Sequence, residues 1–300
     1  MDMNIIFDKA SDIVDVFNIV NDIKTEYNLN IDKNRLYVNE FDETMGSIGF
    51  NMQINFEKDK IKLNHSQLKI GISDNNFYSF INNLSSCGRL EFKILKNKNN
   101  ILILEGDYGY MKSIYNYKIN DVIQCKQFPN EEKFKNLSHA EIIMNSNTFY
   151  KLIKSNKEYG KIYNFTCTQN DFQIQVYDSK DLINSTKFNK ENNEEISIKL
   201  CNPESNIFTI NVQTDDLIKI VKCQKICQKI KLSIYKKFII IDNDFSNGKF
   251  NVLITGLDEN QNMNQDNYEE EDENNEEEED ENNEEEEDEN NEEEDEEYDD

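Results

Sequence analysis

Two hydrophobic periods alternate along the chain. Near the start, apolar side chains recur every three or four residues, at Ile13, Val16, Phe17, Val20 and Ile23. This spacing predicts one buried face of a helix over residues 11–25, with Ser11 as its N-cap. The period becomes two on either side of a turn at residues 32–34, at Leu29, Ile31, Leu36 and Val38. That alternation predicts two strands joined by the turn.

The remainder of residues 1–121 continues in the same manner. A second helix is predicted to begin at Ser73 or Asp74 and to end at Gly88, because glycine is common just beyond a helix. It would bury Phe77, Phe80, Ile81 and Leu84. Strand patterns occupy residues 47–56, 90–95, 101–105 and 111–119.

Residues 139–257 repeat this order. Helices are predicted from Ser146, with Phe149, Leu152 and Ile153 directed inward, and over residues 214–224. Strand patterns occupy residues 140–144, 165–167, 172–176, 195–200, 207–212, 229–235, 238–242 and 250–255. Between the halves, residues 122–138 contain Pro129 and many charges, which is typical of a linker.

The two halves also resemble each other residue by residue. Residues 77–95 (FYSFINNLSSCGRLEFKIL) align with residues 217–235 (LIKIVKCQKICQKIKLSIY) at an offset of 140. The offset places Cys87 on Cys227 and Arg89 on Lys229. A repeat this long indicates a duplicated domain rather than a solenoid. Short connections and many strands predict an α+β fold, with antiparallel sheets and helices on one face.

The charge of the chain is concentrated at its end. Of 60 Asp and Glu residues, 28 lie from Asp258 to Asp300, a segment without Lys or Arg, so residues 1–257 carry 32 acidic and 33 basic side chains. The segment repeats EEEEDENN and has almost no apolar residues, so we expect a disordered tail. It could be a solubilising tail, or an electrostatic device that shields against DNA or binds basic partners.

Few residues are suited to catalysis or to metal binding. The six cysteines form no CxxC pair and the two histidines are isolated. Cys223 and Cys227 could share a helical face, but two thiols without further ligands favour a core position. We therefore expect reduced intracellular thiols, no metal and no cofactor. No 18-residue apolar run and no secretory signal is present in the sequence, so no membrane contact is expected.

Two segments carry a resemblance to a known family. Residues 41–48 (FDETMGSI) resemble the loop after a first-domain hairpin, and residues 128–131 (FPNE) the interdomain connector, of sliding clamps of the proliferating cell nuclear antigen family. The order of elements matches over residues 4–257. The resemblance implies a DNA-clamp fold with clamp domains at residues 1–121 and 139–257, a connector at 122–138 and the added tail at 258–300.

In this family three chains close a ring, so the resemblance implies a homotrimer. An edge strand of the first domain would pair with one in the second domain of the neighbour. Here these would be residues 111–119 and 171–177, and their pairing would cover two sheet edges. The alternative is that both are ordinary strands of a monomer.

The resemblance also implies that the helices face double-stranded DNA, which lysines would contact through phosphates without reading sequence. The candidate residues are Lys151, Lys154, Lys157, Lys219, Lys222, Lys225 and Lys229. A solvated helix face is the alternative. The first half departs from the family, because Ser79, Asn82 and Ser85 align with Lys219, Lys222 and Lys225, and its first helix carries Asp12, Asp15 and Asp22 against Lys24 alone. Three basic arcs would then alternate with three neutral or acidic arcs around a ring.

Family members capture partner peptides in an apolar pocket beside the connector. The matching residues here are Phe41, Met45, Ile48, Phe128, Pro129, Leu253 and Thr255. They could instead be ordinary loop and core residues. Gly46, Cys125 and Lys126 depart from the family pattern, which favours a different peptide.

The function that the resemblance implies is a DNA polymerase processivity factor. It would tether polymerase and repair proteins, would be loaded by an ATP-driven loader, and would act in the nucleus or in a viral replication compartment. The alternative is a clamp-like scaffold or transcription-associated factor without a closed ring. An enzyme is not expected, since no catalytic constellation and no phosphate-binding GxxxxGK[ST] loop is present in the sequence.

Overall fold

The computed structural model describes residues 1–41, 48–73, 75–129, 134, 137–191, 195–201 and 207–257. Residues Met1–Leu257 form one compact unit. None of the helices described in these ranges is long and apolar enough to cross a membrane.

The first half of this unit contains two helices and nine strands within its described residues. In order they are β1 (Met3–Phe7), α1 (Ala10–Ile23), β2 (Tyr27–Asp32), β3 (Arg35–Phe41), β4 (Ile48–Asn55), β5 (Ile61–Leu63), β6 (Gln67–Ile72), α2 (Asn75–Asn83), β7 (Arg89–Leu95), β8 (Lys98–Asp107) and β9 (Lys112–Lys118).

The second half follows the same plan. Its elements are β10 (Ala140–Asn145), α3 (Ser146–Asn156), β11 (Ile162–Thr168), β12 (Asp171–Asp178), β13 (Asp181–Asn189), β14 (Ser197–Leu200), β15 (Ile207–Gln213), α4 (Thr214–Lys219), the 3-10 helix η2 (Val221–Lys225), β16 (Lys229–Ile234), β17 (Phe238–Phe245) and β18 (Gly248–Thr255). The offset of 140 is visible in β7 and β16, which begin at Arg89 and Lys229.

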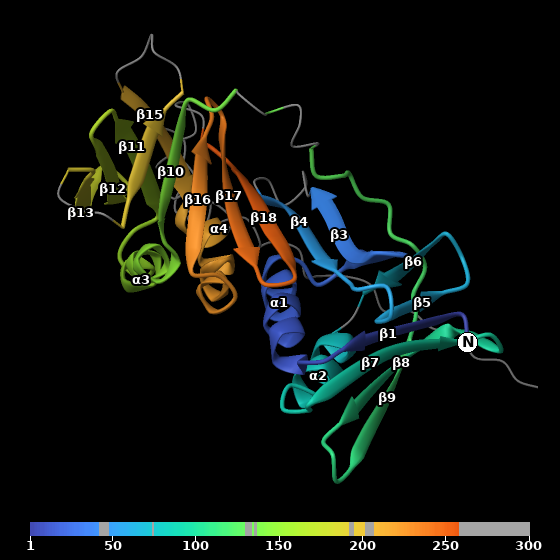
Figure 1. Ribbon diagram of the computed structural model, residues 1–300. Helices are drawn as coiled ribbons and strands as arrows, with labels where there is room; N and C mark the ends of the chain where they lie inside the picture. Colours follow the sequence, from blue (N-terminus) through green and yellow to red (C-terminus); the bar gives the residue numbers. More distant parts are fainter. Residues whose placement is uncertain are drawn as a thin grey trace, which may run out of the picture. The chain divides into compact units, whose positions relative to one another are not determined.

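All described strand pairs are antiparallel, and they form three sheets (Figure 1). A five-stranded sheet has the order β5-β1-β7-β8-β9, and a four-stranded sheet the order β13-β12-β11-β15. The nine-stranded sheet, β14-β10-β16-β17-β18-β4-β3-β2-β6, spans both halves. Its seam is the β4–β18 pair, from Ile48 opposite Ile254 to Ile54 opposite Gly248. Backbone hydrogen bonds therefore join the halves directly.

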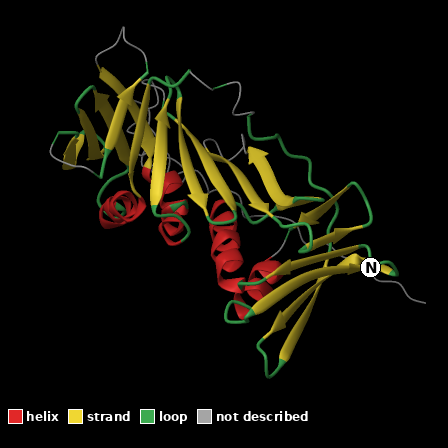
Figure 2. Cartoon of the chain, viewed as in Figure 1, coloured by secondary structure: helices red, strands yellow, loops and turns green. Residues whose placement is uncertain are grey.

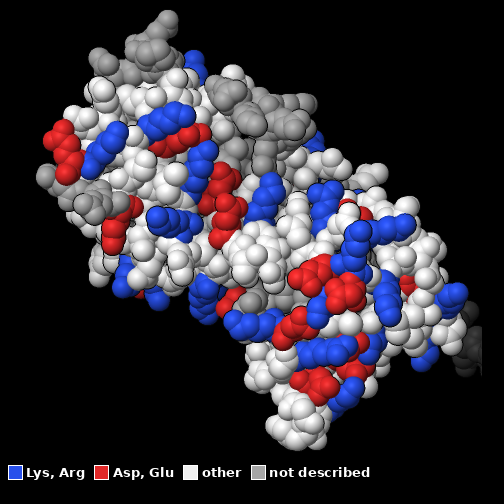
Figure 3. Space-filling model, in the orientation of Figure 1, with Lys and Arg blue, Asp and Glu red and all other residues white. Residues whose placement is uncertain are grey.

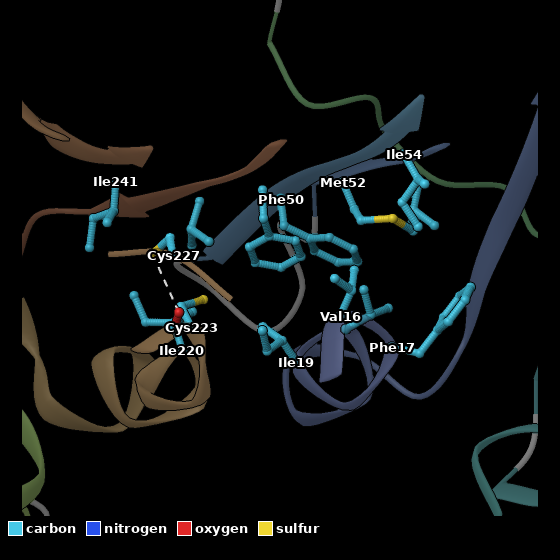
Figure 4. Packing of buried hydrophobic residues seen from close by; sticks show 14 of the residues in the cluster. Val16, Phe17, Ile19, Phe50, Met52, Ile54, Ile220, Cys223, Cys227 and Ile241 are labelled. Atoms are coloured by element: carbon cyan, nitrogen blue, oxygen red, sulfur yellow. Dashed lines mark hydrogen bonds between the residues drawn. The ribbon is translucent and has the colours of Figure 1, made fainter. Parts of the chain in front are cut away.

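The helices cover one side of the sheets, as the sequence predicts (Figure 2). Helix α1 buries its predicted apolar face, since Val16, Phe17 and Val20 are each at most 1% exposed. Beneath the seam, Ile19 of α1 and Ile220 after α4 lie below Phe50 of β4 (Figure 4). One core thus extends under both halves, and the α+β class is confirmed.

The helix predicted over residues 214–224 is interrupted. Helix α4 ends at Lys219, Ile220 has φ −101° and ψ 2°, and the chain continues as the 3-10 helix η2. The buried side chains explain the change, because Leu217, Ile220 and Cys223 recur every three residues and all are 0% exposed. A 3-10 helix has three residues per turn, so the tighter winding keeps this period facing the core.

The prediction that residues 171–177 form an edge strand is wrong. This segment is β12, and it pairs with β11 on one side and β13 on the other. Strand β13 is the edge, and the hydrophobic pattern does not predict it because residues 182–187 are largely exposed and lack a buried apolar alternation. Strands β1, β5 and β6 were also absent from the predicted elements.

Candidate nucleic-acid and peptide interfaces

Helix α3 presents lysines on its solvent side. Its first turn is capped by Asn145, whose side chain accepts a hydrogen bond from the Thr148 backbone N–H at 3.1 Å. Phe149, Tyr150 and Ile153 are buried against the sheet. Lys151 and Lys154 are exposed on α3, and the C-cap residue Lys157 is exposed at the end of the helix. Lys157 lies 3.8 Å from Glu158, an exposed pair of little strength.

The other predicted lysines of the helix layer have carboxylate neighbours. Lys219 pairs within α4 with Asp216, at 3.2 Å. The remaining pairs cross between the halves. Lys222 Nζ lies 2.7 Å from Asp22 of α1, and Lys225 Nζ lies 3.9 Å from Asp15 of α1. Lysines of the second half therefore meet carboxylates of the first half at the junction, closely at Lys222 and more loosely at Lys225.

Lys229 is exposed at the start of β16 and borders a crevice of about 730 Å³. The crevice is lined by charges of both signs and some apolar groups, among them Lys9, Lys225, Lys231, Asp15, Asp242, Asp244 and Ile143. Mixed charge is also evident on the face in Figure 3, where Lys and Arg are interspersed with Asp and Glu. Any phosphate contact at this crevice would involve individual lysines, because the described residues around it form no broad positively charged surface.

The first half offers little positive charge on its helices. Ser79 and Ser85 are exposed, and the Ser79 hydroxyl donates to the Asn75 carbonyl within α2. Lys24, just beyond α1, is directed toward β3, since its Nζ lies 3.1 Å from the buried carboxylate of Glu40 in that strand. The described helices of the first half therefore lack the exposed lysines that the second half carries.

Part of the predicted peptide-binding set forms a separate apolar cluster. Phe128, Ile240 and Leu253 are each 3–4% exposed, and Phe41 packs against them. Aromatic side chains that were not predicted from the sequence lie beside them. The rings of Tyr235 and Phe238 stack at 4.4 Å, and Phe134 lies 5.2 Å from Phe238. The available signal was the pair of aromatic residues flanking the β16–β17 turn.

The other predicted peptide-binding residues are placed differently. Ile48 is 3% exposed and belongs to the main core rather than to this cluster. Thr255 is half-buried at the end of β18, opposite Phe238. Pro129 is half-buried and follows Phe128 directly. Met45 lies outside the described residues.

A buried polar network fixes the connector next to this cluster. The Glu40 carboxylate accepts hydrogen bonds from the backbone and side-chain N–H groups of Asn28, at 2.6 and 3.1 Å. The Asn28 side chain also exchanges hydrogen bonds of 2.9 Å with the Ile123 backbone. The backbone N–H of Phe41 donates to the Lys126 carbonyl at 2.9 Å. Burial, reinforced by the Glu40 carboxylate, raises the pKa of the Cys125 thiol and keeps it neutral.

The described residues contain no group of three His, Cys, Asp or Glu side chains that could hold a metal ion. All six cysteines are free thiols. Cys223 and Cys227 are buried in the core, with the Cys227 thiol directed at the Cys223 carbonyl (Figure 4).

This arrangement of sheets and helices is found in a solved structure. The proliferating cell nuclear antigen of Entamoeba histolytica matches with a TM-score of 0.72, over 86% of this chain and 99% of that chain. The chain has the DNA-clamp fold. Sequence identity is only 13%, so the likeness concerns the fold alone. No family model and no curated protein matches the sequence.

Proposed function

We propose that the chain is a DNA sliding clamp, a processivity factor that encircles duplex DNA and tethers polymerase and repair proteins, with no catalytic activity of its own. The observation that carries the proposal is the clamp fold with all its described helices on one side of the sheets and the exposed lysines of α3 on that side. Those lysines would meet phosphates without reading bases. We place this activity in the nucleus, or in a viral replication compartment if a virus encodes the chain.

The proposal divides the chain into clamp domains at residues 1–121 and 139–257, a connector at 122–138 and an acidic tail at 258–300. The shared order of elements supports equivalent domains. The β4–β18 seam makes the two domains one continuous unit, as a ring of six domains requires.

Ring closure would use two unpaired sheet edges. Strand β9 is the outer strand of one sheet and β13 that of another. Both carry exposed apolar side chains, with Ile114 59%, Leu182 51% and Ile183 46% exposed. Pairing β9 of one copy with β13 of the next would cover both edges and generate a closed ring if the rotation is 120°.

Partner proteins would dock at the apolar cluster beside the connector. The cluster combines buried Phe128 and Leu253 with the aromatic rings of Tyr235 and Phe238, which suits an aromatic anchor on an extended peptide. A polymerase peptide and an ATP-driven loader are the partners we expect there.

Native mass measurement of the full chain tests the ring. A trimer supports the clamp. A strict monomer at micromolar concentration would favour the second candidate, a clamp-like scaffold or transcription-associated factor without a closed ring. The observation that favours this candidate is the close pairing of Lys222, and the looser pairing of Lys225, with carboxylates of the first helix, which would weaken a positive charge facing DNA.

A further inference from the structure

The two ion pairs at the junction join residues far apart in sequence. Asp15 and Asp22 are seven residues apart on α1, and so lie on the same side of that helix two turns apart. Lys222 and Lys225 are three residues apart on η2, and so lie on the same side of a 3-10 helix one turn apart. Lys222 contacts both oxygens of Asp22, at 2.7 and 2.8 Å.

The packing below the seam holds the partners in place. Ile19 of α1 and the neighbouring Ile220 and Cys223 are 0% exposed (Figure 4). With these apolar sides directed into the core, the charged side chains remain near the surface. Asp15 and Asp22 are 33% and 27% exposed, and Lys225 and Lys222 are 55% and 42% exposed. A phosphate can therefore reach the lysines, but it must compete with carboxylates already present.

We propose that Asp15 and Asp22 are affinity-limiting residues that hold Lys222 and Lys225 back from DNA. The inference rests on the proposed DNA-binding function. In the resting protein the two lysines serve the junction between the halves, and DNA is held mainly by Lys151 and Lys154 of α3 and by Lys157 at its C-cap. The carboxylates reduce the attraction of DNA at the junction, so contact there is weaker than the number of lysines suggests.

The 3-10 winding is part of this arrangement. In a continuous α-helix, Lys222 and Lys225 would diverge by about 60° around the axis. In η2 they share one direction, so a single neighbouring helix can neutralise both. Lys151 and Lys154 of α3 have no ion-pair partner among the described residues, which leaves them available to phosphates.

The test is binding of a fluorescent 30-base-pair duplex to the full chain, measured by anisotropy over a series of salt concentrations. We expect D15N/D22N to bind about fivefold more tightly or better at low salt, with a steeper salt dependence, since up to two further phosphate contacts per chain become available. The charge-matched control D59N/D121N changes two exposed acidic residues outside the helices and gives a smaller effect. Adding K222Q/K225Q to D15N/D22N abolishes the gain.

A swapped pair, D22K/K222D, keeps the net charge and the pairing, and should bind DNA like the unmodified chain even if D15N/D22N folds poorly. Equal affinities for D15N/D22N and D59N/D121N would overturn the inference, as would a gain that survives K222Q/K225Q. If binding is lost in K151Q/K154Q/K157Q but is unaffected at Asp15 and Asp22, the inference fails and the proposed function stands. If no variant binds duplex at any salt concentration, the inference fails, and retention on circular DNA after loading decides the proposed function separately.

Discussion

Glu40 shows how a single buried carboxylate organises the connector. It is 1% exposed, and its two oxygens face different partners. One accepts from Asn28, which itself holds Ile123. The other lies beside Lys24. A carboxylate in such a position is stabilising only while these partners remain, because an unpaired buried charge is costly.

Replacing Glu40 with Gln should lower the free energy of unfolding by about 2 kcal/mol, since it removes a buried charge–charge contact and weakens the Asn28 hydrogen bonds. Urea unfolding measures this loss. Hydrogen exchange at residues 123–126 should accelerate as well. Exposed Glu26 supplies the control, and Glu26→Gln should change neither quantity. Slow exchange in the connector of the Glu40 variant would contradict this role.

Glu105 provides a prediction on pH. Hydrogen bonds from Lys93 and then from Lys112 lower the pKa of its carboxyl, although partial burial opposes the shift. The folded pKa is thus below the unfolded value of about 4.3. The stabilisation is present above that value and is lost as pH falls through the folded pKa.

Glu105→Gln should therefore cost about 1 kcal/mol of unfolding free energy at pH 7, and this cost should disappear as the pH is lowered from 7 through the folded pKa. Thermal melts of both proteins across this pH range provide the comparison. Glu158→Gln, at a side chain that is 71% exposed, is the control. A difference that persists unchanged into acid would mean that the pair with Lys93 is not its source.

At the scale of elements, the entry to the connector depends on close backbone contact. The backbone groups of Gly71 in β6 and Asn120 exchange hydrogen bonds of 3.3 and 3.2 Å. A Cβ on Gly71 would lie 2.0 Å from the Asp121 carbonyl oxygen, which cannot be relieved by a side-chain rotation.

Gly71→Ala should displace the chain entering the connector and destabilise the protein by about 1–3 kcal/mol, as overpacking does. Gly88→Ala is the matched control, because the nearest atom to its Cβ would be 3.7 Å away. Urea unfolding of the two variants makes the comparison, and equal stabilities would contradict the contact.

The edge strands carry the prediction on assembly. Ile114→Asp on β9 or Ile183→Asp on β13 would place a charge in the proposed interface and remove about 2 kcal/mol of apolar burial per contact, or roughly 30-fold in association. Native mass measurement should show trimers shifting toward monomers. Ile207→Asp, at an exposed residue on the different edge strand β15, should leave the trimer intact. Equal effects at all three sites would argue against this interface.

Elements with a regular hydrophobic period could be predicted from the sequence. Elements that depend on pairing or packing with distant residues could not. Helix α1 and the β2–β3 hairpin were evident because their apolar residues repeat with the period of the structure. Strand β13 was not, since an edge strand forms by backbone pairing with β12 and needs no apolar stripe. The 3-10 winding of η2 depends on which side chains of residues 217–223 are buried in the core, and this is set by tertiary packing.

The residues of the candidate sites also divide into those that could be predicted from the sequence and those that could not. The spacing of the lysines could be found by comparing the two halves, but their partners could not. Asp22 and Lys222 are 200 residues apart in the chain, and only the folded packing of the two halves brings them together. In the apolar cluster beside the connector, Phe41, Phe128 and Leu253 were among the residues predicted from the sequence. Tyr235 and Phe238 were missed, since local sequence does not reveal which hairpin lies beside the connector.

At the scale of the whole molecule, the proposed clamp would hold DNA by enclosing it, with modest electrostatic attraction. The first 257 residues are nearly neutral, and part of the helix-layer charge is internally paired. Binding that depends on topology should resist salt, whereas binding by phosphate contacts should not. The two modes are therefore separable.

The most direct measurement is retention of the full chain on nicked circular DNA after loading by a clamp loader, followed by linearisation at 0.3 M salt. We expect the protein to remain on the circle through gel filtration and to slide off once an end is cut. Release from circular and linear DNA at the same rate, or retention on both, would contradict a clamp that encircles DNA.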